Sequence, residues 1–396
     1  MLVEVHLRSP NKKVDHMKTL SMPSHASRRD VFRTAGTAFV GAALAGLQAP
    51  NARAQSYTPP AGGGELLRLS ANENPYGPSE SAKQAMMAAM SEGWKYATAE
   101  MPALAKLIAE REGLSPDNVI ITEGSAEVLR IVSLLYGSQG SEMIAARPTF
   151  EQGPDYAEKV GGQLVWVDLD KDMKHDLAGM EGRITNKTGL IYICNPNNPT
   201  ATMVQTKDLR SFIGVAASRA MVLVDEAYID LVDDPAGSAM VDQVRAGKNV
   251  IIARTFSKIH GMAGLRLGFA LARPDIIKRM NEVRMSSPNK MGLVAGVASY
   301  QDKEFMASSR KLVRECLTMT CKTLDELGLR YTKSQANFVM FDTGKPLREF
   351  SIAMRQKGVA VGRPFAPYDT WCRVSMGRVE QMPQFLDAMR AHFKKA

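Results

Sequence analysis

Short apolar runs that alternate with helical patterns place the strongest constraint on how this chain can fold. The runs suited to buried strands are Val119–Thr122, Glu142–Ala146, Leu164–Asp168, Leu190–Cys194, Met221–Asp225, Val250–Arg254 and Arg266–Leu271. Helical patterns lie between several of them, at Met101–Glu112, Ala126–Leu135 and Lys207–Ala217. The alternation predicts an α/β fold, in which helices cover both faces of a buried sheet.

The pattern changes after about Pro288, where a long helical stretch, Phe305–Leu327, precedes a smaller α+β region. With 396 residues, of which 45% are hydrophobic, the chain can fill one large core or two adjoining cores. Charged residues make up 23% of the chain, which is typical of a globular protein and of neither a disordered nor a fibrous one. We therefore expect a large α/β domain followed by a smaller α+β domain.

Charge and cysteine content argue against a nucleic-acid surface and a zinc site. The net charge is +9, but residues 1–54 hold eight Lys/Arg against three Asp/Glu, and no basic block is interleaved with aromatic residues. The cysteines show neither a CxxC pair nor zinc-ligand spacing. We expect buried free thiols, with a disulfide as the alternative, and no metal site. The cysteines are Cys194, Cys316, Cys321 and Cys372.

The first 54 residues have the pattern of a targeting segment. Arg28 and Arg29 precede an uncharged Ala/Gly-rich run, residues 34–52, which ends in an Ala-Arg-Ala tripeptide. This resembles a twin-arginine export signal that is cleaved between Ala54 and Gln55. We expect a signal peptide at 1–54, recognition by the twin-arginine machinery, a flexible linker at 55–65 and a periplasmic mature protein.

Two alternatives for the same segment are an uncleaved membrane anchor and a disordered basic tail. The apolar run contains Gln48 and Pro50 and is rich in Gly and Ala, so it is weakly hydrophobic for a membrane-spanning helix. We therefore favour the export signal and expect no stable membrane span in the mature form.

Polar residues follow several of the expected strands, at the edge where ligands gather in open α/β sheets. After the run at 119–122, Gly124 leads into a helix whose first backbone N–H groups, at Ser125 and Ala126, suit an anion such as phosphate. An ordinary strand–turn–helix connection is the alternative. Asn198 lies in the proline-rich loop after a later strand.

Charged residues also follow two strands. Asp225 ends a Val-rich strand, where a carboxylate needs a cationic partner or caps a helix. Lys258 and Arg266 are isolated cations, because the sequence between Ile259 and Ala272 is otherwise nearly uncharged. Their isolation indicates partners that are not neighbouring side chains.

In their order, these motifs resemble the fold-type I pyridoxal-phosphate enzymes, specifically the class I/II aminotransferases and their histidinol-phosphate aminotransferase subgroup. The resemblance covers Leu66 to Lys394. The motifs that carry it are Ala71–Pro78, Gly124–Glu127, Pro148–Phe150, Asn195–Thr200, Val224–Tyr228, Thr255–Lys258, Arg266 and Trp371–Gly377. It implies a homodimer whose chains have three parts: an N-terminal segment, 66–97, that packs with the small domain; a large domain, 98–288, with a mostly parallel central sheet flanked by helices; and a small domain, 289–396.

The resemblance implies pyridoxal 5′-phosphate as the cofactor. Lys258 would bond to the cofactor aldehyde and later move a proton, and Asp225 would pair with the pyridine nitrogen. The other implied contacts are Ser125, Ala126, Thr255 and Arg266 to the phosphate, Tyr228 and Asn198 to the 3′-oxygen, Phe150 on the ring face, and Tyr96 to the phosphate of the neighbouring subunit. For Phe150 the alternative is an ordinary core aromatic. His260 is expected to be structural.

For the substrate, the resemblance implies that Arg373 grips a carboxylate as a bidentate fork, with Asn337, Arg363 and Tyr76 as further contacts. A surface salt bridge is the alternative for Arg373. The chain departs from the subgroup in having Ala201, Ala126, Ala97 and Phe150 where Gly, an acidic residue, Pro and Tyr are usual.

These inferences predict an exported aminotransferase that moves an amino group from an amino acid or related amine to a 2-oxo acid. Two alternatives remain open at this point. One is a pyridoxal-phosphate C–S or β-lyase or a decarboxylase on the same fold, and the other is a binding protein without turnover.

Overall fold

A computed structural model describes residues 66–394 of the chain. The predicted signal peptide and linker, residues 1–65, lie outside the described residues. Within the described range, no helix combines the length and the hydrophobicity that crossing a membrane requires.

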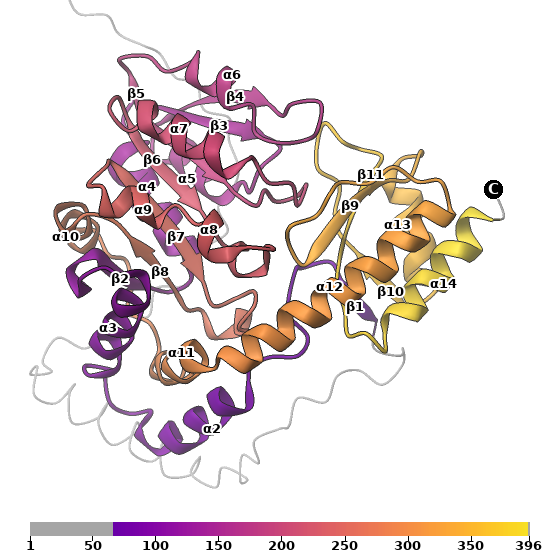
Figure 1. Cartoon of the computed structure of the whole chain (residues 1–396), viewed down its shortest axis with the longest axis horizontal. Helices are drawn as coiled ribbons and strands as arrows, with labels where there is room; N and C mark the ends of the chain where they lie inside the picture. Colours follow the sequence, from indigo (N-terminus) through magenta and orange to yellow (C-terminus); the bar gives the residue numbers. More distant parts are fainter. Residues whose placement is uncertain (1–65, 395–396) are drawn as a thin grey trace, which may run out of the picture. The chain divides into compact units, whose positions relative to one another are not determined.

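Within residues 66–394, seven strands form the main sheet in the order β2-β8-β7-β6-β5-β3-β4 (Figure 1). The strand bounds are β2 (Val119–Thr122), β3 (Glu142–Arg147), β4 (Gln163–Asp168), β5 (Thr188–Cys194), β6 (Met221–Asp225), β7 (Val250–Thr255) and β8 (Gly268–Leu271). β8 runs antiparallel to both of its neighbours, and all other neighbouring strands run parallel. The mostly parallel α/β sheet predicted from the sequence is confirmed.

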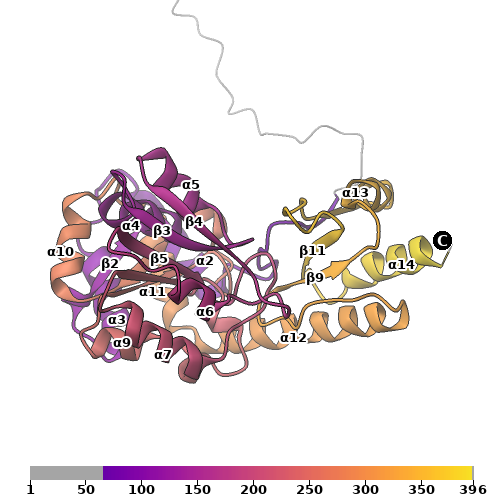
Figure 2. The same cartoon turned by 90° about the horizontal axis from the view of Figure 1, so that it is seen from above.

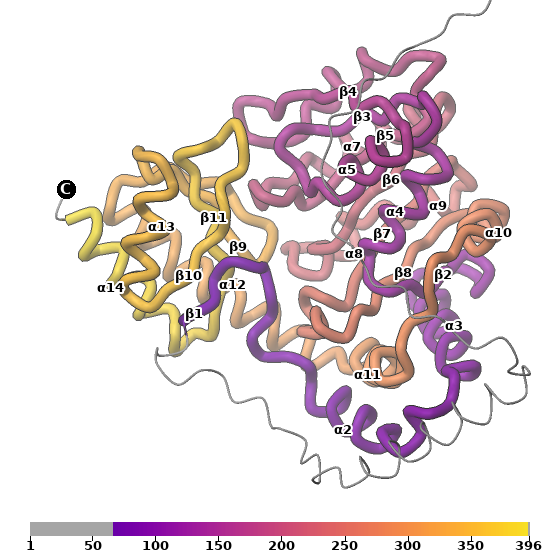
Figure 3. The backbone as a smooth tube through the Cα atoms, turned by 180° about the vertical axis from the view of Figure 1, so that it is seen from behind, coloured from indigo at the N-terminus to yellow at the C-terminus, as the bar shows by residue number. Residues whose placement is uncertain are grey.

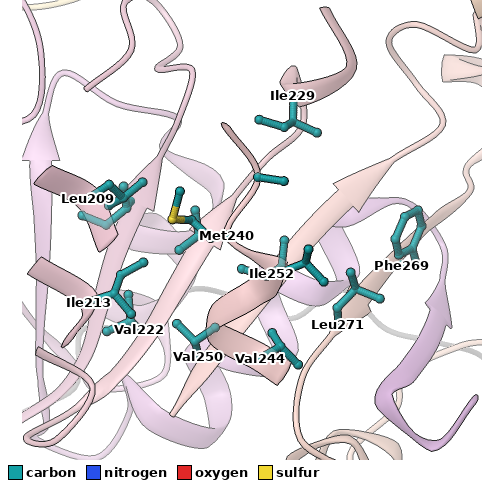
Figure 4. Packing of buried hydrophobic residues seen from close by; sticks show 14 of the residues in the cluster. Leu209, Ile213, Val222, Ile229, Met240, Val244, Val250, Ile252, Phe269 and Leu271 are labelled. Atoms are coloured by element: carbon teal, nitrogen blue, oxygen red, sulfur yellow. The ribbon is translucent and has the colours of Figure 1, made fainter. Parts of the chain in front are cut away.

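Most strand residues are apolar because both faces of the sheet are buried; charged and polar residues stand at the ends of β3 and β4. In β6, Val222 and Val224 belong to one hydrophobic cluster, while Met221 and Leu223 belong to the cluster on the opposite face. Figure 4 shows part of the first cluster, in which Leu209 and Ile213 lie near strand residues such as Val222. The period of two along each strand therefore supplies both cores.

Helices cover the two faces of the sheet as two layers (Figure 2). One layer consists of α3 (Glu100–Glu112), α6 (Leu177–Glu181), α7 (Thr206–Ala216) and α9 (Val241–Arg245), and the other of α4 (Ser125–Tyr136), α5 (Gln152–Lys159) and α10 (Pro274–Glu282). A short helix, α8 (Pro235–Ser238), lies between β6 and α9 in the chain.

The smaller core is built by C-terminal strands and helices together with the first described strand. β9 (Phe338–Asp342) pairs antiparallel with β11 (Trp371–Ser375), and β10 (Val359–Val361) pairs parallel with β1 (Leu67–Leu69). Three helices complete this core: α12 (Lys303–Glu326), α13 (Leu347–Gln356) and α14 (Met382–Phe393).

The N-terminal segment contacts both cores. Its strand β1 belongs to the smaller core, whereas α2 (Glu80–Ala89) packs on α11 (Lys290–Gln301), as Figure 3 shows. The expected domain boundary, at 288, precedes α11. In the structure α11 also packs on α3, and its Leu293 and Ala295 belong to the larger core, so the two cores divide near the start of α12.

Candidate active site

A cavity of about 290 Å³ lies at the carboxyl edge of the main sheet, and ten of the predicted site residues line it. They are Ser125, Ala126, Phe150, Asn198, Asp225, Tyr228, Thr255, Lys258, Arg266 and Arg373. Parallel strands bring the residues that follow them to one edge. Because β8 is antiparallel, Arg266, two residues before its start, reaches the same edge.

One end of the cavity is suited to an anion. Gly124, at φ 76°, precedes the first turn of α4, so the N–H groups of that turn face the cavity edge. A Cβ at residue 124 would collide with the Arg266 guanidinium, and one at Gly268 would lie 2.5 Å from Ser125 N. Arg266 Nη1 also lies 3.4 Å from Ser257 Oγ. A positive helix end, a guanidinium and hydroxyls therefore meet at one place.

Lys258 is the amine of the site. It follows β7, and its Nζ lies 5.4 Å from the centre of the Tyr228 ring. Burial, aided by the nearby Arg373 guanidinium, lowers the pKa of Lys258 to about 8, against the opposing effect of Asp225. A larger share of this amine is therefore neutral near pH 8 than for an ordinary lysine, and only a neutral amine can attack a carbonyl.

Asp225 is a buried carboxylate at the end of β6, only 2% exposed. Its hydrogen bonds come from neutral donors: the Tyr192 hydroxyl at 3.0 Å and the Ala227 N–H at 3.1 Å. Burial raises the pKa of Asp225 to about 6. A cation placed beside Asp225 inside the cavity would offset this desolvation cost, and a protonated ring nitrogen is such a group.

Arg373 reaches the other end of the cavity from β11. Its Nη1 donates to Asn198 Oδ1 at 2.7 Å, and its Nη2 donates to the Ser70 carbonyl at 2.6 Å. Its Nε is buried without a hydrogen-bond partner among the described residues. The bond to Asn198 fixes the amide with its oxygen toward Arg373, which leaves the NH₂ group for a ligand.

Tyr228 presents a buried phenol to the same cavity. Asn72 Nδ2 donates to Tyr228 Oη at 3.1 Å. Burial raises the pKa of Tyr228 well above its usual range, so the group is a neutral hydroxyl that can donate to a ligand oxygen.

Four predicted site residues lie outside this cavity. Tyr96 is 94% exposed. Asn337 donates to the Asn72 and Glu73 carbonyls at 3.0 and 3.1 Å, so it holds the N-terminal segment in place. The Tyr76 hydroxyl accepts the Val379 N–H at 2.7 Å. Arg363 lines a larger, adjoining cavity.

Three residues that sequence reasoning did not assign contribute to the site. Ser257 lies between Thr255 and Arg266: it accepts a hydrogen bond from the Thr255 hydroxyl at 3.0 Å, and its own hydroxyl contacts Arg266. Its position next to Lys258 in the sequence could have identified it as a site residue. Asn72 orients Tyr228 from a distant part of the chain. Tyr192 sits inside β5 with no local signal, since its pattern is that of a core aromatic.

His260 and the four cysteines were expected to be structural residues, and their surroundings in the structure agree with this. The His260 ring nitrogen Nδ1 lies 2.8 Å from Ser299 Oγ inside the larger core. All four cysteines are free; Cys321 is partly buried and the other three are buried.

The cavity combines groups suited to a phosphate, a carboxylate suited to a protonated ring nitrogen, and an amine of lowered pKa. A model of the family described as aminotransferase class I and II matches residues 64–389. The chain is 37% identical over 330 residues to histidinol-phosphate aminotransferase of Moorella thermoacetica, covering 82% of this chain and 85% of that protein. It is 36% identical to histidinol-phosphate aminotransferase of Symbiobacterium thermophilum, covering 83% and 90%.

Solved structures agree with this assignment. The crystal structure of histidinol-phosphate aminotransferase from Sinorhizobium meliloti in complex with pyridoxal-5′-phosphate is similar, with a TM-score of 0.76 and 26% identity over 83% of this chain and 91% of that one. The protein belongs to the class I and II aminotransferase family. It is an aminotransferase, and its cofactor is pyridoxal 5′-phosphate.

Proposed function

We propose that this protein transfers an amino group from an amino acid to a 2-oxo acid, and that Arg373 binds the carboxylate of each substrate. The observation that carries the proposal is the position of three charged groups around one cavity: Lys258, Asp225 and Arg373. A fixed cation opposite the reactive amine suits a substrate with a carboxylate next to its reacting carbon.

The residues present fit the cofactor. The phosphate would be held by the first turn of α4, Arg266 and the Thr255 and Ser257 hydroxyls. Asp225 would accept the ring N–H and keep that nitrogen protonated. Bound in this way, the cofactor supplies an electron sink for negative charge that develops at the substrate Cα.

The chain's own groups then orient the ring and move the proton. The Tyr228 hydroxyl and the free Asn198 NH₂ would donate to the ring 3′-oxygen, and Phe150 would cover one ring face. Lys258 would accept the proton released from the substrate Cα and hold it on its amine nitrogen. Its lowered pKa, about 8, suits a group that must both accept and release a proton near neutral pH.

Arg373 determines which of the bonds to the substrate Cα is broken. The free Nε can join an Nη group in a bidentate fork to the substrate carboxylate. A carboxylate held by Arg373 would be kept from leaving as carbon dioxide, which would favour loss of the proton from the substrate Cα.

We also propose a homodimer in which Tyr96 reaches the phosphate of the neighbouring subunit. The support is an exposed apolar surface on and after α2, where Met87 is 64%, Met90 63%, Trp94 81% and Tyr96 94% exposed. Large apolar side chains gathered on one surface commonly mark an interface.

An absorbance spectrum of the purified protein tests the reaction. We expect a visible band from the lysine-bound cofactor that is absent in Lys258→Ala. An amino acid alone should convert the band to a shorter wavelength, and a 2-oxo acid should restore it. Release of ammonia or carbon dioxide without an acceptor would instead support a lyase or a decarboxylase. The names of the relatives make histidinol phosphate the first donor to test.

Export to the periplasm by the twin-arginine route is a further proposal, and the pattern at residues 27–54 supports it. Arg28→Lys combined with Arg29→Lys should leave the full-length protein in the cytoplasmic fraction, while the unaltered chain appears in the periplasm shortened to Gln55. Unchanged fractionation would refute the proposal.

A further inference from the structure

The Tyr228 hydroxyl has a proton without an acceptor among residues 66–394. Its Oη accepts one hydrogen bond, from Asn72 Nδ2 at 3.1 Å, and no described residue accepts a hydrogen bond from it. Both side chains line the cavity that holds Lys258, and both are buried. Because buried polar groups rarely stay unpaired, this arrangement leaves the phenol proton for a ligand in the cavity.

The Asn72 side chain is itself held by Ser375. The Ser375 hydroxyl donates to Asn72 Oδ1 at 2.9 Å and accepts the Asn72 backbone N–H at 2.8 Å. With its oxygen used by the serine proton, the amide presents its NH₂ group to Tyr228. The direction of the hydrogen bond at the phenol is therefore set from the far side of the asparagine.

Ser375 belongs to β11, the strand that also carries Arg373. Residues two apart on a strand point to the same face, and Arg373 Nη1 donates to Asn198 Oδ1 at 2.7 Å. Tyr228 and Asn198 are the two groups expected to donate to the ring 3′-oxygen. One strand thus holds both of them, Asn198 directly and Tyr228 through Asn72.

The hydrogen bond from Asn72 also affects how strongly the phenol can donate. Burial raises the pKa of Tyr228, and the Arg373 guanidinium and the Asn72 amide oppose that effect. Hydrogen bonds in a chain polarise one another, so a hydroxyl that accepts one donates more strongly. Supported by Asn72, the phenol gives a stronger hydrogen bond to an anionic oxygen than it would give alone.

We propose that Asn72, held by Ser375, is a positioning residue that acts on the ring 3′-oxygen of the cofactor through Tyr228. This inference rests on the proposed function. Negative charge on the ring oxygen holds the proton of the nitrogen that joins the lysine to the cofactor. A strong donor to that oxygen stabilises the charge independently, so the nitrogen loses its proton at a lower pH.

A pH titration of the visible band, without any substrate, tests this relay. Tyr228→Phe should raise the midpoint by at least about 1 pH unit, since it removes the donor. Asn72→Gly should raise it by at least about 0.5 unit, a threefold change in the proton equilibrium. Glycine is the suitable replacement because residue 72 has a φ of 55°, which a Cβ disfavours.

Two comparisons distinguish the relay from a general disturbance of the N-terminal segment. Asn72→Gly added to Tyr228→Phe should cause no further shift, because phenylalanine has no oxygen to accept the amide N–H. Ser375→Ala should raise the midpoint by less, since the amide keeps its donor and loses only its restraint. Ser309→Ala is the matched control. Ser309 is a buried serine that accepts from Asn74 Nδ2 of the same segment at 3.1 Å, and it is hydrogen-bonded to neither Asn72 nor Tyr228.

An unchanged midpoint in Asn72→Gly, where Tyr228→Phe raises it, would overturn this inference and leave the proposed function intact. An equal shift with and without Tyr228→Phe would do the same, because Asn72 would then act independently of the phenol. If Asn72→Gly does not fold, Ser375→Ala with and without Tyr228→Phe gives the same comparison. Absence of a visible band in the unaltered protein would overturn the proposed function and this inference with it.

Discussion

Replacing Asp225 by asparagine should stabilise the cofactor-free protein and weaken its hold on pyridoxal phosphate. Burial raises the pKa of Asp225 from 3.8 to about 6. Each pKa unit corresponds to about 1.4 kcal/mol, so the ionised carboxylate destabilises the cofactor-free fold by about 3 kcal/mol at pH 7.5. Asparagine has the same shape, can accept the Ala227 N–H, and carries no charge.

The pH dependence of this stability difference follows from proton binding at Asp225. Between pH 4 and pH 6 the folded chain binds more protons at Asp225 than the unfolded chain, so the stability of the cofactor-free protein falls as pH rises through that window. The advantage of Asp225→Asn should therefore be about 3 kcal/mol at pH 7.5 and about half of that at pH 5.

Urea unfolding of the cofactor-free protein at these two pH values measures the effect. The cofactor-bound form should respond in the opposite direction, because the ring N–H supplies the cation that Asp225 lacks. A stability gain that is absent at pH 7.5, or equal at both pH values, would refute the reasoning.

Three further predictions concern the site. Arg373→Lys should lower kcat/KM about a hundredfold and leave the visible band intact, since an ammonium group cannot form the bidentate fork; an unchanged kcat/KM in steady-state assays would argue against the grip. Gly124→Ala should raise the dissociation constant of the cofactor at least tenfold in equilibrium titrations, because a Cβ would displace Arg266, whereas Gly214→Ala on α7 should not. Tyr96→Phe should weaken cofactor binding without changing the mass measured by light scattering; equal binding would remove Tyr96 from the partner's site.

Most of the carboxyl-edge residues were predictable because they end a short apolar strand or lie a few residues beyond one. Asp225 ends, and Lys258 follows, a run that is apolar on both faces. The carboxyl ends of parallel strands all lie at the same edge of a sheet, so both residues are expected there. Arg266 was harder to place. The expected strand began at this residue, whereas β8 begins at Gly268 and Arg266 has a φ of 51°. The reversal of one strand, which no local pattern signals, explains why a residue before a strand joins the site.

Residues that act through distant partners could not be predicted from local patterns. The sequence position of Asn337 suggested a substrate contact. In the structure its amide donates to backbone carbonyls of the N-terminal segment. Tyr192 looks like a core aromatic, and its bond to Asp225 depends on the pairing of β5 with β6. Likewise, the apolar residues of α11 fit either core, and only packing assigns them to the larger one.

The parallel pairing of β1 with β10 also bears on when the site can form during synthesis. Leu67 pairs with Val359, and Asn72 donates its N–H to Ser375, 303 residues later. Residues 71 and 72 line the catalytic cavity, yet their anchors leave the ribosome near the end of translation. A partly synthesised chain can fold its large sheet but cannot complete the cavity. Cofactor capture is therefore a late event, and a chain that ends before β10 should bind the cofactor weakly even with Lys258 and Asp225 in place.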